Sequence, residues 1–130
     1  MNIRPDRAEF HRLAREYTVV PVWTELLADL ETPVAAFAKL VGDGPGFVLE
    51  SVEHAERWSR FSFVGRRPTA TLVARDGHIE VTGELAAEVP RDEGVLRAIE
   101  GVLAAYRSPR MPDLPPLHGG LVGYLGYDVV

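Results

Sequence analysis

The aspartate-glycine pair Asp76-Gly77 constrains the fold of this 130-residue chain more than any other local feature. Asp-Gly is typical of a type I′ turn, in which both central residues take positive φ and which joins two antiparallel strands. Pairing outward from this turn gathers four apolar residues on one face of a hairpin over 69–82: Leu72, Ala74, Ile79 and Val81. Because the charged side chains then share the other face, the register is self-consistent and we predict a hairpin.

Three helices are predicted by their start signals and their apolar periodicity. The first begins after Asp6, with Glu9 three residues later completing a capping box. The second begins at Thr32, a capping hydroxyl, followed by Pro33 at the first helical position. The third and longest spans 92–107, where apolar residues recur at helical spacing.

Further strands are predicted at 18–23, where β-branched residues concentrate, and at 119–130, which is apolar on both faces. With the hairpin and the helices, these strands indicate the α+β class, with antiparallel β-sheets and flanking helices. A strand such as 119–130 needs a neighbour on each side. We therefore expect the chain to be an incomplete portion of a larger fold, and to self-associate through this strand.

The stretch 46–65, GFVLESVEHAERWSRFSFVG, places a carboxylate beside a hydroxyl, Glu50 and Ser51. Strand alternation there leaves both faces mostly apolar, so we expect a largely buried strand. A buried carboxylate requires a partner, either a bound cation or a nearby arginine: Arg60, Arg66 or Arg67. The residues alone favour a core strand with one internal ion pair over a binding site.

Composition narrows the class of protein. The net charge of −5 gives no reason to expect a nucleic-acid or membrane partner, and the absence of cysteine excludes disulfides and thiol catalysis. The N-terminus lacks the apolar core of a signal peptide, so we expect a cytoplasmic protein. The four histidines are scattered without metal-ligand spacing, and no triad is apparent. We expect no catalytic and no metal-binding residue in this chain.

Four stretches together resemble one family: VPVWTELLADLETPV (20–34), VLES (48–51), RFSFVG (60–65) and GGLVGYLGYDVV (119–130). They are similar to the N-terminal part of anthranilate synthase component I, with Val48 standing where that family commonly has leucine. The resemblance implies that 1–130 is the N-terminal portion of a larger chorismate-utilising enzyme fold. It also implies that the catalytic C-terminal chorismate-binding domain lies outside this chain.

The resemblance further implies an activity for the complete protein. Members of this family convert chorismate to anthranilate and pyruvate, with magnesium and with ammonia from a glutamine amidotransferase subunit. The chorismate and magnesium residues belong to the C-terminal part, so residues 1–130 alone are expected to be inactive. The N-terminal part carries a feedback site for tryptophan within 46–65. By position, that site corresponds to Leu49, Glu50 and Ser51, with Ser62 as a weaker candidate.

Two alternatives from other classes remain open. The parent protein could be an aminodeoxychorismate synthase component I of the folate pathway, which shares the GGxVGYxGYD pattern seen here at 119–128. The chain could instead be a free-standing amino-acid-binding module. The product formed by the complete protein distinguishes an anthranilate synthase from an aminodeoxychorismate synthase. The length of its reading frame distinguishes a larger enzyme from a free-standing module.

Overall fold

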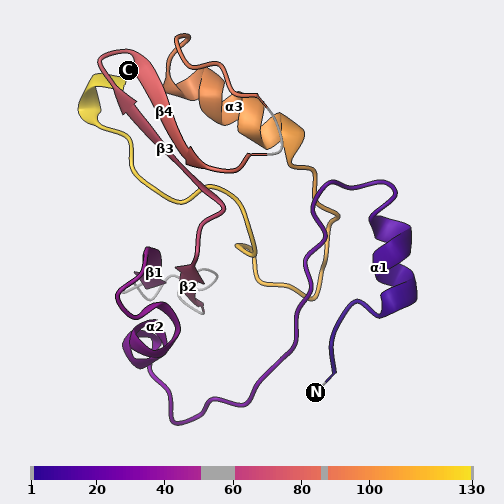
Figure 1. The fold of residues 1–130 in the computed structure, drawn as a ribbon. Coiled ribbons are helices and arrows are strands. Elements are labelled where there is room, and N and C mark those ends of the chain that lie inside the picture. Colours follow the sequence, from indigo (N-terminus) through magenta and orange to yellow (C-terminus); the bar gives the residue numbers. More distant parts are fainter. Residues whose placement is uncertain (1, 51–60, 86–87, 130) are drawn as a thin grey trace. The chain divides into compact units, whose positions relative to one another are not determined.

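The computed structural model describes residues 2–50, 61–85 and 88–129 of the chain (Figure 1). These residues form two compact units. The first unit is built from the described residues within 1–25, 69–114 and 118–130. The second is built from those within 26–68 and 115–117.

The first unit contains the predicted hairpin. Strands β3 (Ala70–Arg75) and β4 (His78–Gly83) pair antiparallel, with Leu72 opposite Val81 and Ala74 opposite Ile79. The turn residues Asp76 and Gly77 have φ angles of 49° and 79°, the combination that a type I′ turn requires. The predicted turn and register are both confirmed.

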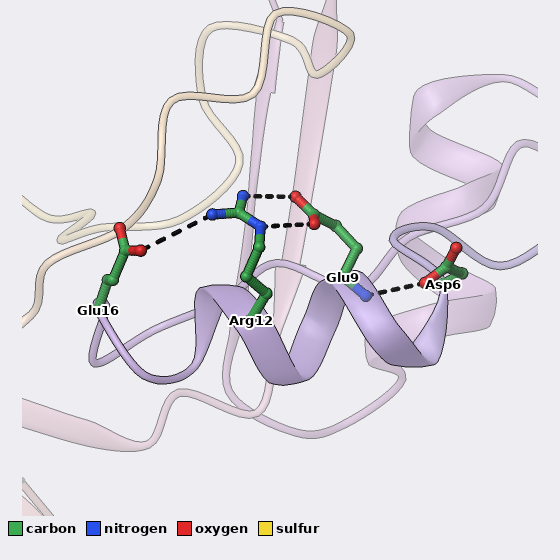
Figure 2. A network of polar contacts seen from close by, with 4 residues as sticks. All are labelled: Asp6, Glu9, Arg12 and Glu16. Carbon is green, nitrogen blue, oxygen red and sulfur yellow. Dashed lines mark hydrogen bonds and ion pairs between the residues drawn. The ribbon is translucent and has the colours of Figure 1, made fainter.

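Helix α1 (Arg7–Leu13) begins where the capping signal predicted. The Asp6 carboxylate accepts a 2.9 Å hydrogen bond from the Glu9 backbone N–H. The Glu9 side chain does not complete the capping box, because both of its oxygens accept from the Arg12 guanidinium at 2.7 and 2.8 Å (Figure 2). Arg12 lies 3.7 Å from Glu16 as well, so one cation joins two carboxylates along the helix.

Helix α3 (Val95–Ala105) is shorter at both ends than the predicted 92–107. Gly94 precedes the helix and provides no side-chain cap. Asp92 is instead engaged with the hairpin, where its Oδ1 lies 2.7 Å from Nδ1 of His78. Within α3, Ala98 and Val102 are buried on one face, as their spacing of four predicts.

Residues 18–23 do not form the predicted strand. Trp23 makes one antiparallel bridge to Arg4, with N···O distances of 2.8 Å in both directions, and the Arg4 guanidinium lies 5.1 Å from the Trp23 ring. Near the other end, Thr18 Oγ1 accepts a 2.7 Å hydrogen bond from the backbone N–H of Arg107. The proline within this segment removes a donor, and isolated contacts replace a continuous ladder.

Residues 119–129 do not form the predicted central strand, and Tyr127–Val129 form a 3₁₀ turn, η1. Four glycines lie within this segment, and glycine disfavours strands because it loses most conformational freedom. No described strand pairs with it, and the side chains of Tyr124 and Tyr127 are each 96% exposed. The expectation of self-association through this strand therefore loses its structural basis.

The second unit contains α2 (Pro33–Val41) and an antiparallel ladder of β1 (Gly46–Glu50) and β2 (Ser62–Arg66). Thr32 Oγ1 accepts a 3.1 Å hydrogen bond from the backbone N–H of Ala35, and α2 ends at Gly42 with a φ of 59°. The predicted start and end of this helix are confirmed. Helix α2 contacts both strands of the ladder.

The α+β class is confirmed by three α-helices and two antiparallel two-stranded sheets in the described part of the chain. Five described residues are buried, all in the first unit: Leu13, Ile79, Ala98, Val102 and Pro109. The second unit is therefore ordered by backbone pairing and by half-buried side chains. The longest described helix has 11 residues against the roughly 20 of a membrane span, and none among the described helices qualifies as one.

The ion pair between Glu9 and Arg12 predicts how the Glu9 carboxyl titrates. The hydrogen bonds from Arg12 lower the pKa of the Glu9 carboxyl, because they stabilise its ionised form. Because the folded pKa lies below the unfolded value, the stabilisation of α1 is present at neutral pH. It is lost as the pH falls through the folded pKa.

We expect Arg12→Gln to raise the pKa of Glu9, as measured by carbon NMR of the glutamate carboxyls during an acid titration. Arg15→Gln is the matched control, since it removes a guanidinium near the end of α1 without touching Glu9. An unchanged Glu9 titration in Arg12→Gln would show that the pair does not form in solution.

Candidate functional site

The register of the β1–β2 ladder decides how the predicted site residues face one another. Leu49 lies opposite Phe63, and Glu50 lies opposite Ser62. Because directly opposed residues share a face of the sheet, Leu49 and Phe63 lie on one face, and Glu50 and Ser62 lie on the other. Three of the four predicted residues thus meet at the same end of the ladder, and Ser51 lies outside the described residues.

One face at this end is apolar and aromatic. The side chain of Leu49 is 43% exposed, and its opposite residue Phe63 is half-buried. The rings of Phe61 and Phe63 have centroids 6.1 Å apart and planes tilted by 35°. A leucine beside two rings forms a surface on which another flat aromatic group can pack.

Phe61 and Phe63 are not among the site residues predicted from the sequence. Their alternation in RFSFVG indicated a shared face. The register that places this face beside Leu49 depends on pairing between segments that are distant in sequence. The signal was therefore present, but it could not be assigned to a site before the strands were paired.

The other face carries Glu50 and Ser62, and both are exposed. The prediction of a largely buried carboxylate is wrong: Glu50 is exposed, because it is the last residue of β1, which belongs to a two-stranded sheet. Arg66 lies opposite Gly46, four residues and about 13 Å along the ladder from Glu50, so it cannot be the partner of Glu50. Arg67 follows Arg66, still farther away.

This polar face offers one anionic acceptor and one hydroxyl side by side. None of the ion pairs in the described part of the chain involves Glu50, and Arg60, the third predicted partner, lies outside the described residues. The Ser62 hydroxyl can donate one hydrogen bond and accept others at the same position. The chemistry fits an ammonium group better than an anion.

The described residues do not fit a magnesium site. Within the described ranges, no three His, Asp or Glu side chains come together in a way that could hold a metal ion. An octahedral magnesium site needs carboxylate oxygens that converge on one point, and the acidic side chains of these ranges lie apart. The family resemblance assigned the magnesium ligands to polypeptide outside this chain.

The first unit contains two open cavities. One of about 410 Å³ lies at the start of α1, and the other, of about 720 Å³, lies beside the end of β4. Neither is lined by Leu49, Glu50 or Ser62.

Comparison with known proteins relates this α+β chain to subunits of a multi-component synthase. It is 43% identical over 129 residues to anthranilate synthase component 1 of Arthrobacter globiformis, covering 98% of this chain and 24% of that protein. It is 41% identical over 128 residues to the protein of the same name from Mycobacterium tuberculosis strain H37Rv, covering 95% of this chain and 25% of the relative. A third relative of that name, from Acetivibrio thermocellus, is 30% identical over 126 residues, covering 97% of this chain and 26% of the relative.

The chain is a homologue of the N-terminal part of anthranilate synthase component 1, as the four sequence stretches indicated. It spans about a quarter of the length of these curated relatives. No protein-family model matches the chain.

The register of the ladder can be tested by paired cysteines, because the chain has none of its own. Directly opposed residues in an antiparallel pair have Cα atoms about 4.5–5.5 Å apart, within the span of a disulfide. We expect Glu50→Cys/Ser62→Cys to form an internal disulfide under mild oxidation, measured by mass spectrometry of the free thiols. Leu49→Cys/Ser62→Cys is the control, since its side chains lie on opposite faces. Equal oxidation of both pairs would contradict the register.

Proposed function

We propose that this chain is the regulatory N-terminal part of an enzyme that makes anthranilate and pyruvate from chorismate and ammonia in tryptophan biosynthesis. The observation that carries the proposal is 43% identity across 98% of the chain to a protein named anthranilate synthase component 1. The relatives from Mycobacterium tuberculosis and Acetivibrio thermocellus carry the same name. Since the chain spans about a quarter of their length, the chemical step belongs to residues outside 1–130.

The proposal includes a second subunit. A protein named component 1 has at least one further component, and a glutamine amidotransferase would supply the ammonia that the reaction consumes. Magnesium and chorismate would bind outside these 130 residues. The contribution of 1–130 is then regulation rather than catalysis.

The effector that we propose is tryptophan, bound at the Glu50–Ser62 end of the β1–β2 ladder through Leu49, Glu50, Ser51 and Ser62. Leu49 and Phe63 lie opposite each other and provide an apolar face on which an indole ring can pack. Glu50 provides an exposed carboxylate for the ammonium group, and Ser62 lies directly opposite it. Because the two faces carry these residues at the same end of the ladder, a ligand that contacts both would lie at that end.

Inhibition through such a site requires that tryptophan bind two states of the enzyme with different affinity. A residue that contacts only the effector can therefore weaken inhibition without changing catalysis. A catalytic residue cannot be changed in this way, because its loss lowers activity whether or not tryptophan is present.

We predict that residues 1–130 alone form no anthranilate. Purified 1–130 would be incubated with chorismate, ammonium and magnesium while anthranilate fluorescence is followed. The protein encoded by the complete reading frame, treated in the same way, is the positive control, and analysis of its product separates anthranilate from aminodeoxychorismate. Anthranilate formed by 1–130 above a protein-free blank would overturn the assignment of the chemistry to other residues.

We predict that Ser51→Phe in the complete protein shifts the tryptophan inhibition curve to higher concentration while activity without tryptophan stays unchanged. The phenylalanine ring would occupy effector space. Ser51→Ala should have a smaller effect, since one hydrogen bond whose partner stays buried contributes roughly 1–3 kcal/mol, or about 5- to 150-fold in affinity.

Ser108→Phe serves as the matched control, because Ser108 is an exposed serine of the proline-rich connector in the first unit. Inhibition curves that coincide for wild type and Ser51→Phe, at one chorismate concentration, would exclude Ser51 from the effector site. Loss of activity without tryptophan in Ser51→Phe would instead support the interpretation of this stretch as a core strand.

A further inference from the structure

In the second unit, the ring of Phe47 lies over Gly65. They lie directly opposite each other in the β1–β2 ladder. A Cβ atom placed on Gly65 would lie 2.1 Å from Cε1, 2.4 Å from Cζ and 2.8 Å from Cδ1 of Phe47. The aromatic ring therefore covers the bare Cα of the glycine, and no larger residue fits beneath it without displacement of the ring or the strand.

A second close approach lies beside the first. A Cβ on Gly46 would lie 2.6 Å from the carbonyl oxygen of Gly65 and 2.6 Å from Cγ1 of Val41, the last residue of α2. At Gly44, in the turn between α2 and β1, the nearest atom to such a Cβ is 3.4 Å away, an ordinary contact. The crowding is thus confined to the point where the end of α2, the start of β1 and the end of β2 meet.

These contacts restrict the register of the ladder. If β2 slipped by one residue, Phe47 would face Val64 or Arg66, and a side chain would occupy the space that its ring now fills. A slip of one residue also moves every side chain of a strand to the other face of the sheet. In a unit whose described residues include none that is fully buried, few other contacts oppose such a slip.

The register matters because it decides which residues meet at the other end of the ladder. In the observed register, Leu49 faces Phe63 and Glu50 faces Ser62. We propose that Gly65 and Phe47 are positioning residues for the effector site, holding β1 and β2 in the register that presents its apolar and polar faces together. This inference rests on the proposed function of that site, and it assigns Gly65 and Phe47 no contact with the effector.

The test replaces Gly65 by alanine in the protein encoded by the complete reading frame. The φ angle of Gly65 lies outside the left-handed region, so the backbone accepts alanine and the crowding is with the Phe47 ring alone. We expect the tryptophan concentration for half-maximal inhibition to rise at least about fivefold, or ~1 kcal/mol. Activity in the absence of tryptophan should stay at the wild-type level.

A second experiment tests whether removal of the Phe47 ring restores tryptophan inhibition in Gly65→Ala. Phe47→Ala removes the ring, and the double variant Gly65→Ala/Phe47→Ala gives the new methyl group the space that the ring leaves. The double variant should be inhibited at a lower tryptophan concentration than Gly65→Ala, although it carries one more substitution. This non-additivity arises only if the two residues act through their mutual contact. It also keeps the proposal testable if Gly65→Ala alone fails to fold.

Two controls separate positioning from general destabilisation. Gly44→Ala makes the same chemical change in the same unit without crowding. Val102→Ala removes buried side-chain volume from α3 in the first unit and should lower the thermal unfolding temperature. We expect the tryptophan inhibition curves of both variants to coincide with the curve of wild type.

The outcomes are distinguishable. If Ser51→Phe shifts the inhibition curve but neither Gly65→Ala nor Phe47→Ala does, the positioning role is overturned and the effector site stands. If Ser51→Phe leaves the curve unchanged as well, the proposed effector site falls, and the positioning role falls with it. If Val102→Ala shifts the curve as far as Gly65→Ala does, Gly65 acts through general stability and not through register.

Discussion

Antiparallel backbone pairing is the constraint on which the described structure depends. Only five described residues are buried, none of them in the second unit, and Leu27 and Leu30 of that unit are 90% and 98% exposed. Burial of apolar surface therefore contributes little to the second unit, and hydrogen-bonded ladders align its strands. Because backbone pairing aligns these strands, the register of the pairing decides which side chains meet.

The two ladders obtain their register in different ways. In the β3–β4 hairpin, the Asp76-Gly77 turn is two residues long and both of its residues have positive φ, so the turn itself sets the pairing. The β1–β2 ladder has no such short turn, since the two strands are separated by residues 51–61. We infer that its register is fixed instead by side-chain contacts: the fit of the Phe47 ring on Gly65 and the approach of Val41 to Gly46.

This difference bears on function. The residues that we propose to contact tryptophan lie at the end of the ladder that is farther from those glycines, so the site is assembled by contacts outside itself. An exposed site of this kind contains few interactions that could hold its own geometry. Its affinity for a ligand would respond to small changes in the packing between α2 and the two strands, which suits a regulatory role better than a catalytic one.

Local signals in the sequence determined the caps of α1 and α2, the end of α2 at Gly42, and the hairpin with its register, because each depends on residues within one or two turns. The family also followed from short sequence stretches. Only tertiary structure decided the rest. Asp92 pairs with His78 instead of starting α3, residues 119–129 remain without a described strand partner, and Glu50 is exposed at the last position of β1. Each of these outcomes depends on which distant segment lies beside the residue, and apolar periodicity contains no information about that neighbour.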